Sequence, residues 1–414
     1  MSQQDAPGSH APGELLDAFG LTFPLPFRVG YIITLAVWGW GLNLHGLHLC
    51  KIDVPTLIRY PGRSSPQHIS HHLSTYRLAI VLSALFSVSI CLFWLLTWHV
   101  PSRVVAFDWL PMTYLTAFLA VFLVPFRNLP SGGRRRLLST LRRICVGGLA
   151  QAQEGKFADI LLADVLTSYA KVFGDVFVMM CMFLSPGASA TDRPDRSCGG
   201  RAVAPLLMAV PSAIRLRQCI IEYLRVRRAP YKESTGWGGR HLANALKYST
   251  AFPVLLFSCL QRGVQEDHER LKRLNRLWLV AVTVNSLYAF YWDVANDWDL
   301  TLFSPRRERA SPHHRWGLRS RLAFRSAGLY YTVIALDLVL RCSWSMKLSP
   351  HLSKFSDFES GIFLIELFEV FRRWVWMFFR VETEWIRHLS TTGLPVGTEE
   401  ILLDNYQGKH DNEE

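Results

Sequence analysis

The sequence has 414 residues, of which half are hydrophobic and 19% are charged, and it contains 14 Trp and 25 Phe. Soluble domains carry about 25% charged residues, so this composition predicts an all-α polytopic membrane protein with substantial loops. The net charge of +12 comes from basic residues clustered in a few segments, which favours membrane orientation and contact with anionic lipids over nucleic-acid binding.

Nine apolar runs are long enough to cross a bilayer, which takes about 20 residues. We expect a polar N-terminal tail (1–26), a three-helix membrane region (27–126), a basic loop (127–158), a six-helix domain (159–388) and a disordered C-terminal tail (389–414). The nine runs lie at 27–50, 76–98, 109–126, 159–184, 203–224, 241–260, 277–298, 328–347 and 360–381.

The distribution of positive charge predicts the orientation. If the N-terminus is lumenal, the loops on the cytosolic side hold 22 Lys and Arg, and the opposite loops hold 10. Positive residues are retained on the cytosolic side, so we expect a lumenal N-terminus and a cytosolic C-terminus. The loop at 261–276, on the predicted lumenal side, is also basic and reduces the difference in Lys and Arg count between the two sides.

Two of the cytosolic loops are strongly basic. Residues 131–143, SGGRRRLLSTLRR, have the pattern of a short amphipathic helix on the membrane surface. The loop at 299–327 contains Pro and His and is expected to be irregular. We favour topology and lipid contact over a specific partner site for both. Their basic residues include Arg134, Arg135, Arg136, Arg142 and Arg143 in the first and Arg306, Arg307, Arg309 and Arg315 in the second.

The eight cysteines show no CxxC spacing, and six of them fall in or beside apolar runs. Cys145 and Cys198 lie in different loops and offer no obvious pair. Neither a zinc site nor a disulfide framework is therefore expected. No Gly-rich phosphate loop, nucleophile motif or metal constellation occurs, so we expect no enzyme activity, no metal and no cofactor.

The last six predicted spans carry charged and amide side chains, whereas the first three are almost free of charge. A charge at the bilayer centre costs roughly 2.5 to 3.5 kcal/mol on insertion scales, so these side chains must face protein or water. In chain order the polar positions are Asp164, Thr167 or Ser168, Lys171 and Asp175; Arg215; Asn244, Lys247 and Tyr248; Asp293 and Asp297; and Asp337, Arg341 and Trp344.

The ninth span continues into the segment ELFEVFRRWVWMFFRVETE, residues 366–384, which has a polar stripe at helical spacing. A single stripe of this kind is either a set of Glu–Arg pairs that fixes helix packing or a pathway for an anion. Polar residues in six consecutive spans favour the pathway, with Arg380 near its cytosolic exit. The stripe consists of Glu366, Glu369, Arg373, Trp376 and Arg380, with Arg372 beside it.

These residue types suit a small, multiply charged oxyanion. Arginine binds phosphate oxygens through a planar fork of donors, lysine adds a point charge and tyrosine adds a hydroxyl donor. Aspartates would accept from a phosphate P–OH and offset the cationic charge, so that the ion could also leave. Trp344 and Trp376 would line the path.

Six segments within residues 155–385 resemble the EXS domain, the membrane domain of eukaryotic phosphate exporters. GWGLNLHGLHLCKIDVPTLI is similar to the helices that precede this domain. Only 26 residues precede the first span, so we expect no SPX domain, and the chain is most similar to the short fungal Golgi members. The six segments are KFADILLADVLTS, PSAIRLRQCIIEYLRVRR, HLANALKYST, FYWDVANDWDL, LDLVLRCSW and FEVFRRWVWMFFRVETE.

The resemblance implies a site. At one position of the family pattern this chain has Thr167 in place of Asn, a hydroxyl for an amide. The residues expected to bind phosphate are Arg215, Lys247, Tyr248, Arg341, Trp344, Arg372 and Arg373. The polar residues expected along the path are Asp164, Thr167, Asp293, Asp297 and Glu369.

The resemblance also implies a function. We expect a multi-pass Golgi protein that moves inorganic phosphate from the lumen to the cytosol and supports glycosylation and the retention of Golgi and ER residents. The alternative is a membrane sorting scaffold that retains or recycles glycosyltransferases. Expected partners are phosphate and membrane lipids, with Golgi glycosyltransferases, coat adaptors and a second copy of the chain in a homodimer as further candidates. The intramembrane aspartates also suit proton coupling.

Overall fold

The structure is a computed structural model of the chain. It describes residues 18–392 except for 59–70, 125–130, 152–153, 185–188, 190, 192–193, 195, 197, 201, 229–237, 265–266, 311–314, 325 and 345–358. Most of the two predicted tails therefore lies outside the described residues.

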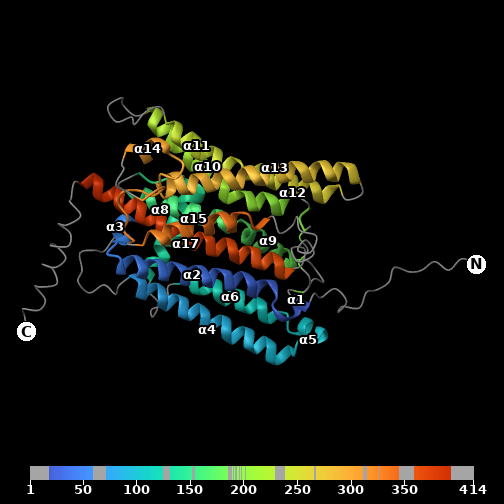
Figure 1. Ribbon diagram of the computed structural model, residues 1–414. Helices are drawn as coiled ribbons and strands as arrows, with labels where there is room; N and C mark the ends of the chain where they lie inside the picture. Colours follow the sequence, from blue (N-terminus) through green and yellow to red (C-terminus); the bar gives the residue numbers. More distant parts are fainter. Residues whose placement is uncertain are drawn as a thin grey trace, which may run out of the picture.

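Every regular element in the described ranges is helical, which confirms the all-α prediction (Figure 1). The long helices lie side by side along one common direction. They are α2 (Leu25–Leu49), α4 (His71–Thr97), α6 (Trp109–Leu123), α10 (Val203–Arg228), α13 (His268–Trp292), α15 (Ala327–Arg341) and α17 (Glu359–Thr392).

Two predicted spans are each divided into two helices, and short helices cover the ends of the bundle. The divided spans are α8 (Lys156–Ser168) with α9 (Ala170–Leu184), and α11 (Gly239–Ser249) with α12 (Ala251–Gly263). The short elements are α1 (Ala18–Thr22), α3 (Val54–Leu57), α5 (Pro101–Ala106), α7 (Ser131–Arg142), α14 (Pro305–Ala310) and the π-helices η1 (Arg143–Gly147) and η3 (Asp293–Asp297).

Four described helices are long and apolar enough to cross a membrane: α2, α4, α10, and α13 together with η3. The pair α8 and α9, bent by 64°, would form a fifth span. This supports a multi-pass membrane protein. The total of nine spans stays a prediction, because α6 and α15 have only 15 residues each and α17 carries the charged stripe.

Helix α2 lies between the pair α4 and α6 on one side and α17 on the other. Phe27 packs with Phe93, Tyr114 and Phe118 from α4 and α6 in one aromatic cluster. Toward α17, the indole Nε1 of Trp374 donates to the Gly39 carbonyl over 2.9 Å. A Cβ at position 39 would lie 2.8 Å from Trp374, so glycine permits this close approach and α2 joins the two parts of the bundle.

Three departures from regular helical geometry lie beside predicted site residues. The bend between α8 and α9 follows Ser168, and the break between α11 and α12 at Thr250 follows Tyr248. Pro253 has no N–H for the carbonyl of Ser249, which favours that break. The third place is η3, which contains Asp293 and Asp297, and π-helical turns occur frequently at functional sites.

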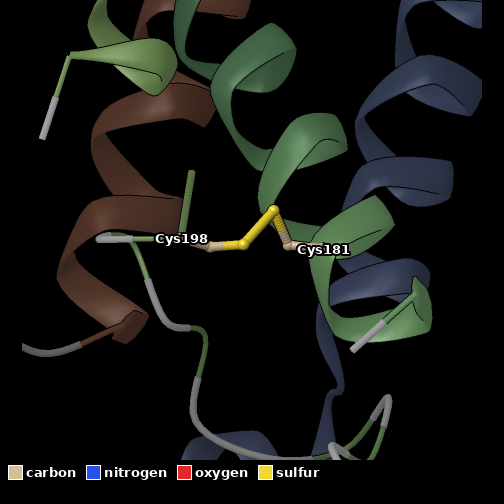
Figure 2. Close-up of a disulfide and its surroundings, with 2 residues drawn as sticks. All are labelled: Cys181 and Cys198. Atoms are coloured by element: carbon tan, nitrogen blue, oxygen red, sulfur yellow. A yellow bond between two sulfur atoms is a disulfide. The ribbon is translucent and has the colours of Figure 1, made fainter. Parts of the chain in front are cut away.

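A disulfide joins Cys181, near the end of α9, to Cys198 in the following loop (Figure 2). The Cα atoms lie 6.3 Å apart across a sequence separation of 17 residues. The expectation of no disulfide was wrong because Cys181 was assigned to an apolar span and Cys198 to a loop. The chain turns back after α9, and this turn brings the two sulfurs together.

The basic segment at 131–143 forms α7 and the start of η1, but two of its arginines form hydrogen bonds within the protein. Arg134 is buried and donates to the carbonyl of Val124 over 2.7 Å, at the end of α6. Arg143 forms hydrogen bonds of 2.9 and 3.1 Å with Asp159. Arg135 and Arg142 are exposed. In the loop expected to be irregular, residues 305–310 form α14, so that expectation was wrong there.

Candidate anion site

The polar stripe of α17 points into the protein. Glu366 and Arg372 are each 3% exposed, and Arg373 is 6% exposed. Trp376, one turn further on, is fully buried, and the Arg373 guanidinium lies 4.5 Å from the centre of its ring. The prediction that the polar stripe of this helix faces the interior of the protein is therefore confirmed.

A chain of ion pairs begins at Arg372 and crosses to α15 and η3. Arg372 Nη1 lies 3.0 Å from Asp337 Oδ1, and Arg341 Nε lies 2.9 Å from Asp337 Oδ2. Arg341 also pairs with Asp293. The other oxygen of Asp293 lies 2.8 Å from the Lys247 ammonium. Four elements, α11, η3, α15 and α17, thus meet through their charges.

Two predicted carboxylates lie at the edges of this chain. Glu369, three residues before Arg372, accepts a hydrogen bond of 3.0 Å from Arg372 Nε. Asp297 lies 3.2 Å from Lys247 and 4.0 Å from Arg380. Arg380 in turn pairs with Glu384 over 2.9 Å, so the ion pairs extend toward the C-terminal end of α17.

A second group forms around Asp164 of α8. Arg215 Nε lies 2.6 Å from Asp164 Oδ1, and the Tyr248 hydroxyl donates to the same oxygen. The Arg215 guanidinium lies 4.8 Å from the centre of the Tyr248 ring and also donates to Gln218 over 2.6 Å. This group holds an arginine of α10 and a tyrosine of α11 against α8.

Arg373 lies at the junction of the two groups. Its Nε donates to the Ser168 hydroxyl over 2.8 Å, and its Nη2 donates to the Thr167 hydroxyl over 3.2 Å. Arg372 also reaches Ser168, over 3.4 Å. Within the described ranges, Arg373 Nη1 is buried without a hydrogen-bond partner. No described carboxylate pairs with Arg373, although it interacts electrostatically with Asp293 and Asp164.

The structure therefore brings most of the predicted site residues together in what we call the central network. Trp344 lies apart from it: its indole donates to Ser286 over 3.0 Å and its ring packs on Trp278. The central network consists of Asp164, Arg215, Lys247, Tyr248, Asp293, Asp297, Asp337, Arg341, Glu369, Arg372 and Arg373, with Thr167 and Ser168 as hydroxyl partners.

Two members of the central network, Asp337 and Ser168, and one residue that contacts it, Gln218, were not among the predicted site residues. Asp337, which was predicted only as a polar position of its span, bridges Arg341 and Arg372. Ser168 was an alternative to Thr167, and both bond Arg373. Gln218 follows Arg215 by three residues and accepts a hydrogen bond from it. Residues three apart on a helix are neighbours, so the sequence could have identified this contact.

A cavity of about 990 Å³ leads to the central network from the end of the bundle where α3 lies (Figure 1). Its lining includes Asp164, Arg215 and Asp297 at the network, with Arg380 and Arg240 further out. Arg240 is exposed, so the cavity reaches the surface. Arg380 lines this cavity but is itself buried, and its expected place near an exit stays a prediction.

Electrostatics at the mouth keep Glu384 ionised. Burial alone would raise the pKa of this carboxyl, but Arg380 and Arg387 outweigh burial and hold the pKa below its usual value. No group of three or more His, Cys, Asp or Glu within the described residues is arranged to hold a metal ion. The polar donors that the site presents are arginine, lysine and hydroxyl groups.

Comparison with known proteins agrees with the resemblance drawn from the segments. Protein ERD1 homolog 1 of Schizosaccharomyces pombe is 28% identical over 381 residues, covering 91% of this chain and 95% of that protein. Protein ERD1 homolog 2 of the same yeast is 26% identical over 390 residues, covering 86% and 95%. Solute carrier family 53 member 1 of Mus pahari is 27% identical over 381 residues, covering 89% of this chain and 50% of that protein.

A family model described as the EXS family matches residues 23–386. This range runs from the turn before α2 to the last turns of α17 and includes every residue of the central network. The chain belongs to the EXS family.

Proposed function

We propose that this protein carries inorganic phosphate across a membrane and that the central network binds the ion during its passage. The observation that carries the proposal is Arg373. Its guanidinium is buried and charged, yet its hydrogen-bond partners are two neutral hydroxyls, and Nη1 has no described partner. A buried unsatisfied donor is costly, and a phosphate oxygen would satisfy it.

The balance of charge around Arg373 suits a transported ion. The central network holds five basic and five acidic side chains. A phosphate monoanion would add one negative charge, while its P–OH groups would donate to carboxylates such as Asp293 or Asp164. Binding would then be selective for a protonated oxyanion without being so tight that the ion cannot leave. The five bases are Arg215, Lys247, Arg341, Arg372 and Arg373, and the five acids are Asp164, Asp293, Asp297, Asp337 and Glu369.

A binding measurement tests this role. A ligand that binds only the folded protein raises its melting temperature with ligand concentration. Phosphate should therefore stabilise the purified protein, and Arg373→Ala should abolish most of that shift. Arg135→Ala, which removes an exposed arginine of α7, is the matched control. Equal phosphate-dependent shifts in the two variants would exclude Arg373 from the site.

We further propose that the start of α2 faces the lumen of a secretory compartment and that the cavity opens to the cytosol. The charge distribution of the loops supports this orientation, and so does the placement of the cysteines. The Cys181–Cys198 disulfide lies after α9, at the end where α2 begins, whereas Cys50 and Cys145 are free at the opposite end. Disulfides persist in oxidising compartments.

The Golgi membrane is the proposed location, and return of phosphate from its lumen to the cytosol is the proposed direction. Similarity to the two ERD1 homologs of Schizosaccharomyces pombe supports the assignment to the short group of the family. Phosphate released in the lumen by glycosylation reactions would be the cargo. Support for the retention of Golgi and ER residents would follow from this transport.

A sorting scaffold is the second candidate. Arg135 and Arg142 of α7 are exposed at the proposed cytosolic face. Arg134 and Arg143, by contrast, form hydrogen bonds within the protein. They could contact an adaptor or a lipid headgroup. If the scaffold hypothesis is right, a Golgi glycosyltransferase should be mislocalised in cells that carry the double variant Arg135→Ala/Arg142→Ala, while phosphate transport continues. Normal localisation with this variant would reject it.

A further inference from the structure

A second cluster of buried ion pairs lies at the end of the bundle where α2 begins. Arg28 Nη1 of α2 lies 2.8 Å from Glu359 Oε2 of α17. Arg196 Nη2 lies 3.1 Å from the same oxygen, and Arg196 Nη1 lies 2.6 Å from Asp175 Oδ1 of α9. We call these four residues the outer clasp. Arg28 is 3% exposed and Asp175 is 4% exposed, whereas the side chain of Arg196 is 28% exposed, so Arg196 is the member of the clasp that solvent reaches.

Arg196 differs from the other three because it is carried by a loop. It lies two residues before Cys198, and the disulfide ties this loop to Cys181 of α9 (Figure 2). The side chain of Arg196 forms ion pairs with Asp175 on α9 and with Glu359 on α17. Burial alone would lower the pKa of Arg196, but Asp175 and Glu359 outweigh burial and raise it, so Arg196 stays charged.

The outer clasp lies on the far side of the central network from the cavity. Glu359 is the first residue of α17, and Arg373 follows it by 14 positions, which is about 21 Å along a helix. The lining of the cavity includes none of the clasp residues. In the described residues the cavity opens at one end of the bundle, and the ion pairs of the clasp join α2, α9 and α17 at the other end.

Between the two clusters lies Glu366. It is 3% exposed, and its Oε1 has no hydrogen-bond partner among the described residues. Charged and titratable groups from each neighbouring element act on it: Asp175 and Lys171 of α9, Arg196 of the loop and Arg28 of α2. Because Glu366 is buried behind the clasp, the reactivity of a side chain at this position reports whether the clasp is open.

The convergence of Arg28 and Arg196 on a single carboxylate oxygen is also an arrangement that suits an oxyanion. Arginine forks bind carboxylate and phosphate oxygens in the same manner. A phosphate arriving from the clasp side would compete with Glu359 for both guanidiniums. Once Arg196 exchanges Glu359 for phosphate, the link between α9 and α17 is broken, while the disulfide still holds the loop on α9.

We propose that the outer clasp is a lumenal gate and that Arg196 is its latch, released when phosphate takes the place of Glu359 on Arg28 and Arg196. This inference rests on the proposed function for its cargo and its direction. The closure of the clasp, however, can be measured without any transport. A failure of the gate is therefore distinguishable from a failure of the proposed function.

The test is cysteine accessibility in the full-length chain reconstituted in liposomes. Glu366→Cys places a thiol behind the clasp, and a membrane-impermeant maleimide is added to the lumenal face. Labelling of the chain without this substitution gives the background from native cysteines. Adding Arg196→Ala should raise the labelling rate about tenfold, since it removes charge-assisted bonds to two helices. Arg103→Ala, an exposed arginine on α5 at the same end, should leave the rate unchanged.

Phosphate provides the second arm of the test. With Arg196 present, lumenal phosphate should accelerate the labelling of Glu366→Cys above the rate in chloride of equal ionic strength. With Arg196→Ala, phosphate should add little, because the gate is already released. Glu359→Gln, which keeps the side-chain size and removes the charge, should also accelerate labelling and covers the case in which Arg196→Ala fails to fold. Equal rates with and without an intact clasp, or no phosphate effect in the intact chain, would overturn the proposal.

Discussion

Arg373 Nε lies 2.8 Å from Ser168 Oγ, although the two residues are 205 positions apart in the sequence. This contact joins the ninth predicted span to the bend between α8 and α9. It holds the guanidinium through a neutral hydroxyl, so the positive charge of Arg373 remains available to an anion. The neighbouring Arg372, by contrast, is paired with Asp337 and Glu369.

The hydroxyl partners of Arg373 should therefore affect phosphate binding. Ser168→Ala removes the acceptor of a buried charged donor, which costs about 1 to 3 kcal/mol. We expect a severalfold rise in the phosphate concentration for half-maximal transport, because Arg373 loses its fixed position. Ser139→Ala, at an exposed position of α7, is the control. An unchanged concentration dependence in Ser168→Ala would show that this contact does not position the site.

Asp293 should be important for stability as well as for the site. It accepts from Lys247 and Arg341 in the buried part of the bundle. Removing one partner of a buried ion pair costs about 3 to 5 kcal/mol, so Asp293→Asn should lower the melting temperature in detergent strongly. Asp299→Asn removes a carboxylate from the more exposed pair with Arg307 and should cost at most about 1 kcal/mol. Similar losses in both variants would contradict the assignment of Asp293 to a buried network.

The disulfide and the free cysteines give a test of orientation. In intact vesicles prepared from the membrane that contains the protein, peptide mapping should find Cys181 linked to Cys198. An impermeant thiol reagent outside the vesicles should label Cys50 and Cys145, which are free and exposed. Labelling of these two cysteines only after the membrane is opened would reverse the proposed orientation.

The ion pairs of Glu384 predict a specific pH dependence. The pKa of Glu384 is lower in the folded protein than its ordinary value, so its stabilising contribution is complete above that ordinary value, about 4.3. The contribution is lost as the pH falls through the lowered folded pKa. The difference in melting temperature between the protein and Glu384→Gln should thus stay constant from about pH 7 to pH 5 and shrink below about pH 4. A difference that disappears by pH 5 would contradict the pairing with Arg380.

The inward faces of several helices followed from periodic patterns, whereas the choice of binding residues followed from the resemblance to the EXS domain. The 3 and 4 residue spacing in α17 placed Glu366, Arg373 and Trp376 on one face, and all three are buried. The same spacing placed Asp337 and Arg341 on one face of α15. Such predictions succeed because a helix fixes which side chains share a face, and because charge in a membrane protein must avoid lipid.

The remaining features depend on contacts between distant segments. Arg28 and Arg196 were not among the predicted site residues, yet both meet Glu359. Local spacing contains no information on such pairs. The Cys181–Cys198 bond and the bend after Ser168 likewise depend on how the chain turns back after α9, which no periodic pattern records.

Phosphate flux in reconstituted liposomes tests the central claim most directly. The intact protein should show saturable phosphate transport, and Arg373→Ala should reduce it about tenfold or more, as expected for the loss of charge-assisted hydrogen bonds of about 1.5 to 3 kcal/mol. Arg135→Ala should retain the rate of the intact protein. Equal phosphate transport by the intact protein and Arg373→Ala, or no transport by either, would contradict the account.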